Sequence, residues 1–122
     1  MAKELFHPDT DQIQLSAVLD ALSDPIRRNI VLSLADDGEQ NCSSFTGLSP
    51  KTNLTYHYIR LREAGLTRTR IEGPQRLITL RSGDIEARFP GLLAAVLAGA
   101  RSERRLDVMS GYEIAPSMTL PG

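Results

Sequence analysis

The sequence predicts an α+β fold that is mostly α-helical, with one two-stranded hairpin set among the helices. Three observations lead to this prediction. Apolar residues recur at helical spacing in four separate stretches, Gly65 ends the third stretch, and the period then changes from helical to alternating over residues 67–81. With 122 residues, 41% of them apolar, the chain fits a single domain that has its own core.

Two helices are expected before residue 38. Apolar side chains recur at helical spacing within residues 9–23, and the first residues of that stretch are suited to cap a helix. A second helix is expected to begin at Pro25, because the missing N–H of proline costs nothing at the first helical position, and to end near Gly38. Its outer face is expected to carry Arg27, Arg28 and Asn29.

A third helix follows a polar, turn-like segment that Phe45 and Leu48 are expected to anchor. Ser49 is a good N-cap and Pro50 fits the first helical position, while Gly65 is typical of a left-handed C-cap. The inner stripe of this helix is expected to be Leu54, Tyr58 and Leu61. The opposite, polar face carries Lys51, Thr52, Asn53, Thr55, Tyr56 and Arg60.

A hairpin and a last helix complete the pattern. The hairpin turns at Glu72-Gly73-Pro74-Gln75, and the helix is expected to begin at Ser82 and to be kinked or divided by Pro90. Beyond about Gly99 the apolar pattern fades into a charged run. We therefore expect one domain over residues 1–100, followed by a charged, flexible tail over residues 101–122.

Positive charge is concentrated in the middle of the chain, although the formal net charge of the whole chain is −1. Residues 1–50 hold three basic and eight acidic side chains, net −5. Residues 51–81 hold seven basic and two acidic side chains, net +5, and residues 82–122 hold four basic and five acidic, net −1. Because local potential rather than overall charge displaces the counterions of DNA, the middle segment is suited to a nucleic acid.

The order of elements is helix, helix, short helix, helix, hairpin and helix, and its middle matches a helix-turn-helix followed by a two-stranded β wing. Taken alone, a polar helix is more often an ordinary surface helix, and a basic hairpin is more often merely solvated. Their ordered combination favours duplex DNA, because hydrogen-bonding side chains on a helix suit the major groove and arginines on a hairpin suit phosphates.

Two stretches, ALSDPIRRNIVLSLA and KTNLTYHYIRLREAGLTRTRIEGPQRLITLR, resemble the ArsR/SmtB family of bacterial winged-helix regulators. The LREAGL run after Thr-Tyr-His is the most specific part, and the likeness runs from Leu22 to about Leu97. The resemblance implies a homodimeric repressor of transcription. It also implies that the first and last helices form the dimer interface and that the helix near Pro50 enters the major groove of operator DNA.

The resemblance further implies which residues contact DNA. In the recognition helix they are Lys51, Thr52, Asn53, Thr55, Tyr56 and His57, with Arg60 one turn later. In the wing they are Arg68, Arg70, Gln75 and Arg76. By its chemistry Asn53 suits an adenine edge, and Lys51 or Arg60 suits guanine. The chain departs from the family at Ile59 and Arg60, where the family often has a basic and an apolar residue respectively. For His57, phosphate binding and a bridge between helix and wing are equally supported.

Neither a metal nor another cofactor is expected. Many such regulators sense metals through paired cysteines or through clusters of histidine and carboxylate, but Cys42 stands alone, and His7 and His57 lie in different elements. A tight zinc site needs three or four nitrogen or sulfur ligands. Cys42 is expected to be a half-buried structural residue, although two copies in a dimer would still allow it to sense oxidants.

Other classes of function find less support in the sequence. No nucleophile elbow, phosphate loop or HExxH motif is present, so we do not expect an enzyme. The alternative to a DNA-binding repressor is a winged-helix interaction module that binds protein or RNA. A polar N-terminus and the lack of a long apolar run indicate a cytoplasmic protein without a membrane partner. The expected effector is a small molecule or a redox signal.

Overall fold

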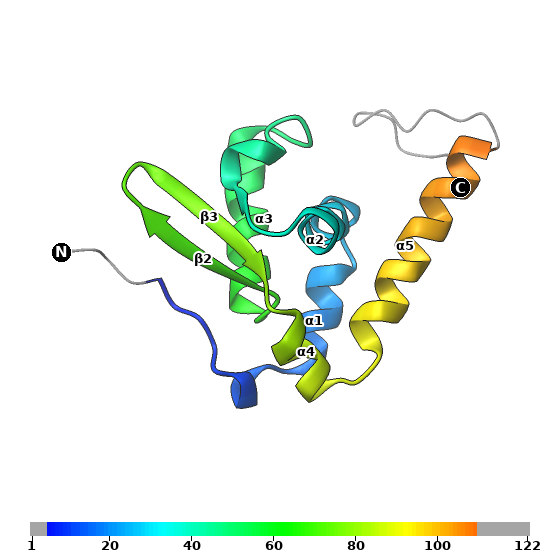
Figure 1. The fold of residues 1–122 in the computed structure, drawn as a ribbon, viewed down its shortest axis with the longest axis horizontal. Coiled ribbons are helices and arrows are strands. Elements are labelled where there is room, and N and C mark those ends of the chain that lie inside the picture. The colour runs from blue at the N-terminus through cyan, green and yellow to red at the C-terminus, as the bar shows by residue number, and fades with distance from the viewer. Residues whose placement is uncertain (1–4, 110–122) are drawn as a thin grey trace.

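The computed structural model describes residues 5–109. Most of these residues are helical, and the strands form a single antiparallel sheet (Figure 1). The α-helices are α1 (Leu15–Leu22), α2 (Pro25–Asp37), α3 (Lys51–Glu63), α4 (Ser82–Arg88) and α5 (Leu92–Met109). The strands are β1 (Gln40–Asn41), β2 (Thr67–Glu72) and β3 (Gln75–Leu80). Two 3-10 turns complete the set, η1 (Thr10–Gln12) and η2 (Cys42–Phe45). The predicted α+β class with a winged helix-turn-helix is confirmed.

Helix α2 lies at the centre of the molecule, in contact with α1, α3, β3 and α5 (Figure 1). Its inner face supplies Ile30 and Val31, which are fully buried. α3 adds Leu54 and Leu61 to the same core, and the sheet adds Ile78. Aliphatic side chains from every layer therefore hold α3 and the wing in one fixed arrangement.

The prediction of one unbroken helix over residues 9–23 is wrong. The structure has η1, then two extended residues, then α1. The break places Ile13 in the core with 1% of its surface exposed, and Arg88 donates to the Ile13 carbonyl with Nη2 at 2.6 Å. Ile13 and Gln14 both have extended backbones, so the helix begins only after them.

Helix α2 begins at Pro25 as predicted, and Asp24 caps it by accepting from the amides of Ile26 and Arg27 at 2.8 and 3.1 Å. The expected outward position of Arg27 is wrong. Only 6% of Arg27 is exposed, and its Nε donates to the Ala21 carbonyl at 2.7 Å. The last carbonyls of α1 lack partners within their own helix, so this guanidinium satisfies them.

The wing forms as predicted, with Glu72 opposite Gln75 across the turn. The strand β1 was not predicted, because it consists of two residues and pairs Gln40 with Ile78 on the outer side of β3. Ile78 is the core residue of β3, with 1% of its surface exposed. The order β1-β3-β2 leaves β2 at one edge of the sheet.

Helix α3 begins at Lys51, one residue later than predicted. Pro50 is extended with ψ at 150°, and no side chain caps the helix, so Ser49 does not act as its N-cap. The C-terminal end follows the prediction. Gly65 has φ at +89°, and the amide of Leu66 donates to the carbonyl of Leu61 at 3.0 Å, which closes the last turn.

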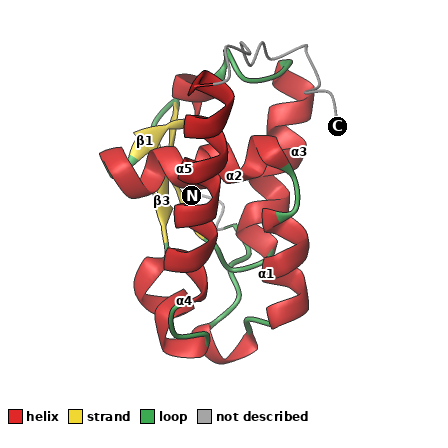
Figure 2. Ribbon diagram, turned by 90° about the vertical axis from the view of Figure 1, so that its right-hand side faces the viewer, coloured by secondary structure: helices red, strands yellow, loops and turns green. Residues whose placement is uncertain are grey.

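The predicted break at Pro90 is confirmed, since α4 ends at Arg88 and α5 starts at Leu92. The expected loss of structure near Gly99 is wrong, because α5 continues to Met109 along the side of α2 (Figure 2). The charged run stabilises this extension through an ion pair of Arg101 with Asp36 at 2.6 Å. The remainder of the predicted tail, residues 110–122, lies outside the described residues.

Of the helices between residues 5 and 109, none combines the length and the hydropathy that are needed to cross a membrane.

Replacing Gly65 by alanine should lower the free energy of unfolding by about 1–3 kcal/mol, because its φ is positive and a new Cβ would lie 2.6 Å from Ile13 Cγ1. Gly99→Ala is the matched control. Nothing lies within 4 Å of a Cβ at Gly99, which is inside α5, so this change should raise stability by about 0.5–1 kcal/mol. Urea denaturation measures both, and equal effects of the two changes would contradict the role of Gly65.

Candidate nucleic-acid interface

Helix α3 presents a polar face away from the core. Leu54, His57 and Leu61 are buried, which fixes the rotation of the helix about its axis. The opposite face therefore exposes side chains that donate or accept hydrogen bonds. These are Lys51, Thr52, Asn53, Thr55 and Tyr56, and they are five of the residues that the sequence predicted for DNA contact. They lie together on the first half of the helix.

His57 does not lie with them. Only 7% of it is exposed, and its Nδ1 lies 3.2 Å from Nη1 of the buried Arg27. Because a guanidinium can only donate, Nδ1 accepts and the ring is neutral with its proton on Nε2. Burial lowers the pKa of His57 below its ordinary value, and the positive charge of Arg27 acts in the same direction while Asp24 opposes both. His57 bridges α3 to α2, not to the wing.

Arg60 lies on the side of α3 that faces α1. It forms an ion pair with Asp20, and its guanidinium carbon lies 5.9 Å from the centroid of the Tyr56 ring. Tyr56 in turn meets the His57 ring edge-on at 5.6 Å and keeps 55% of its surface exposed. Arg60 is thus restrained by α1 and Tyr56, although its side chain remains partly exposed.

The wing carries free cations and one paired cation. Arg68 and Arg76 are exposed and form no ion pair with any residue between 5 and 109, and Gln75 is exposed at the turn. Arg70 differs, because it pairs with Glu39 at 3.1 Å and with Glu72 of its own strand. The structure therefore brings Gln75 and Arg76 together at the tip of the wing and draws Arg70 toward the start of β1.

Cys42 is the first residue of η2 and is half-buried. Burial raises the pKa of the Cys42 thiol, and the nearby Arg76 offsets part of that increase. The hydroxyl of Tyr58 donates to the Cys42 carbonyl at 2.8 Å, and burial raises the pKa of Tyr58 to about 12. A protonated thiol is a weak nucleophile, so these surroundings favour the structural interpretation of Cys42 over an oxidant sensor.

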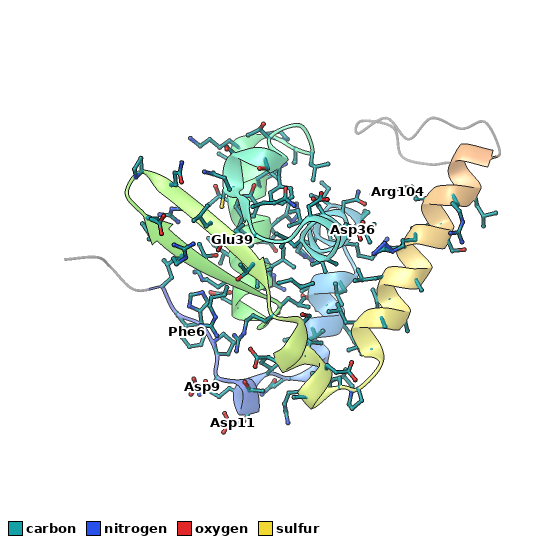
Figure 3. All side chains as sticks on the ribbon, in the orientation of Figure 1. Phe6, Asp9, Asp11, Asp36, Glu39 and Arg104 are labelled. Carbon is teal, nitrogen blue, oxygen red and sulfur yellow. The ribbon has the colours of Figure 1, made fainter. Side chains whose placement is uncertain are left out.

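The segment from Leu5 to Asp9, here called the N-terminal arm, runs beside β2 with Phe6 exposed (Figure 3). The amide of Thr69 donates to His7 Nε2 at 2.9 Å, and Arg62 Nε donates to the Phe6 carbonyl at 3.1 Å. Burial and the charge of Arg68 lower the pKa of His7. Sequence reasoning missed these contacts, because nothing local in the arm signals partners more than fifty residues away.

The arm is also held by a buried arginine at the end of β3. Arg81 Nη1 donates to the Pro8 carbonyl at 2.7 Å, and its Nε donates to Asp84 at 2.8 Å. The bond from Arg81, followed by one from Thr10, lowers the pKa of the Asp84 carboxyl. Arg81 thus joins the arm, the wing and α4 at one point.

Metal ligands are not gathered in this part of the molecule. Within residues 5–109, no group of three or more histidine, cysteine, aspartate or glutamate side chains is arranged so that it could hold a metal ion.

Helices α1, α2 and α3, followed by the wing β2–β3, define a winged helix-turn-helix protein. The crystal structure of an ArsR family transcriptional regulator shares this fold, with a TM-score of 0.52 and 20% sequence identity, over 80% of this chain and 97% of that one. The uncharacterized HTH-type transcriptional regulator YceK of Bacillus subtilis (strain 168) is 35% identical over 86 residues, which cover 68% of this chain and 85% of the relative.

No family model matches the chain. From the identity to YceK and the extent of the match, the chain belongs to the family of HTH-type transcriptional regulators, and its fold is the ArsR winged helix-turn-helix that the sequence resemblance implied. Proteins of this class bind DNA and are in general not enzymes.

Lowering the pH from about 6.5 to 5.5 should destabilise the protein. His7 and His57 are both acceptors with lowered pKa, so the unfolded chain binds more protons than the folded one in this window. The contribution of the two histidines to the free energy of unfolding is fully present above the ordinary pKa of 6.5. It is lost as the pH falls toward their pKa values in the folded protein.

Urea denaturation across this pH range measures the effect. The double variant His7→Gln, His57→Gln is the control, since glutamine accepts a hydrogen bond without titrating. It should flatten the pH dependence, and an undiminished dependence would show that other groups cause it. Asp84 does not interfere, because its pKa is lowered from an ordinary value of 3.8.

Proposed function

We propose that the protein is a dimeric, sequence-specific repressor that places α3 in the major groove of operator DNA and the wing against the backbone. The observation that carries this proposal is the outer face of α3, where five hydrogen-bonding side chains are exposed together on a helix whose rotation the core fixes. A helix of this kind can read base edges, because every base pair presents a distinct pattern of donors and acceptors in the major groove.

The contact residues have different roles in this proposal. Lys51, Thr52, Asn53, Thr55 and Tyr56 face the groove, while Arg68, Gln75 and Arg76 approach phosphates. Arg60 and Arg70 first have to leave Asp20 and Glu39, so they contribute less. His57 acts from inside by holding α3 on α2.

A gel shift with DNA from upstream of its own gene tests the proposal. Two copies that make about 6–8 phosphate contacts should give a slope of log affinity against log salt of about −5 to −7. The alternative function, a module that binds protein or RNA, predicts a flat slope with duplex DNA. A flat slope would therefore reject the repressor.

Arg76→Ala should weaken DNA binding more than Arg70→Ala does. Arg76 forms no ion pair among residues 5–109, whereas Arg70 is already neutralised by Glu39 and Glu72. Loss of one phosphate contact per protomer should make the salt slope of the dimer shallower by about 2 for Arg76→Ala. Titrations at several salt concentrations measure this, and a larger change for Arg70→Ala would contradict the assignment.

The dimer is supported by apolar residues on α1. Leu15 and Leu19 are 44% and 46% exposed, and they lie one turn apart on the same face of the helix. Figure 2 looks onto the side of the molecule where α1 and α5 are both at the surface. A second copy that covers this side would place two recognition helices to read half-sites about 34 Å apart.

Leu19→Glu should convert the dimer into monomers, because it puts a charge into the proposed interface. Sedimentation equilibrium measures the mass, and affinity for DNA should fall with it. The control is Gln14→Glu, which adds the same charge at an exposed residue just before α1. A Leu19→Glu protein that remains dimeric would place the interface elsewhere.

The repressor is released by a signal in this proposal, and the raised pKa of Cys42 favours a small molecule over an oxidant.

A further inference from the structure

A cavity of about 670 Å³ lies between α3, η2 and the wing. This volume is within the range of roughly 300–1,000 Å³ that is usual for sites of small organic molecules. One side is apolar, since Leu54, Tyr58 and Ile59 of α3 line it together with Leu5 of the N-terminal arm. Ile59 keeps 37% of its surface exposed, so an apolar surface is accessible to a ligand there.

The charged lining of this cavity has one sign. Among residues 5–109, Lys51, Arg62 and Arg76 contribute to it, and no aspartate or glutamate does. Arg62 uses its Nε to hold the Phe6 carbonyl, while Lys51 and Arg76 form no ion pair within the described part of the chain. Two unpaired cations beside an apolar wall suit a ligand that has an apolar body and a negative group.

We propose that this cavity binds an apolar organic anion, and that this anion and DNA exclude each other. The exclusion rests on the proposed function, because Lys51 and Arg76 also belong to the surface proposed for DNA. An anion held between them neutralises the charge that phosphates require. By linkage, the anion lowers the affinity for DNA by the same factor by which DNA lowers the affinity for the anion.

A second cavity of about 510 Å³ provides an internal comparison. It lies between α2, β3 and α5, and its apolar lining includes Leu34, Leu80 and Leu97. Of the residues that the structure describes, Glu39 is the one charged residue that lines it. Glu39 is paired with Arg70, and within residues 5–109 no cation lines this cavity, so it lacks the unpaired cations that would hold an anion in the first one.

Two fluorescent probes with the same ring system test the site on the free protein, without DNA. One is 8-anilino-1-naphthalenesulfonate, which is an anion, and the other is N-phenyl-1-naphthylamine, which is neutral. Arg76→Gln should weaken binding of the anion about tenfold and change binding of the neutral probe little. Arg68→Gln removes the same charge from an exposed residue that does not line the cavity, so it should leave both affinities almost unchanged.

Cys42 reports where the probe binds, because it lines the first cavity and not the second. The anionic probe should slow alkylation of Cys42 by iodoacetamide, which mass spectrometry follows. It should also raise the Kd for duplex DNA. An unchanged alkylation rate, or equal losses of affinity in Arg68→Gln and Arg76→Gln, would overturn the site.

Binding that protects Cys42 but leaves the Kd for DNA unchanged would overturn the exclusion. Failure to bind duplex DNA in the absence of any probe would instead overturn the proposed function, and the probe measurements on the free protein would still decide the site.

Discussion

The orientation of α3 depends on the buried guanidinium of Arg27. Arg27 lies on α2 and reaches both the carbonyl end of α1, through Ala21 and Asp20, and the ring of His57 on α3. No carboxylate forms an ion pair with Arg27 within the described residues, so the partial negative charge at the end of α1 offsets its charge instead. One side chain thus fixes the mutual positions of three helices. Its loss would leave carbonyls unsatisfied inside the core.

The cations on the surface around α3 differ in whether a carboxylate pairs with them, and this difference matters more than their number. Arg60 and Arg70 are held by carboxylates of α1 and of the segment before β1, whereas Lys51, Arg68 and Arg76 form no ion pair in residues 5–109. Exposed ion pairs are weak, so a polyanion can break them, but at a cost that unpaired cations do not have. The free cations therefore determine where an anion approaches first.

The sequence predicted what depends on local chemistry. Pro25 started α2, Gly65 ended α3 and the Gly-Pro turn set the wing, because each of these residues restricts its own backbone. Prediction from the sequence failed where a contact with a residue distant in the chain determines the local structure. Arg27 is polar by pattern yet buried by three partners, and the strand β1 exists only because β3 lies beside it. The same limit applied to the site, where the face of α3 was predictable but the burial of His57 and the pairing of Arg70 were not.

The N-terminal arm has a consequence for how the protein behaves at high concentration. β2 lies at the edge of the sheet, where free amide and carbonyl groups can recruit a strand from another molecule. His7 occupies the Thr69 amide, and Arg62 and Arg81 fasten the arm on either side of it. The arm therefore covers this edge and opposes aggregation by strand addition. Chains that lose the arm would become prone to polymerise through the wing.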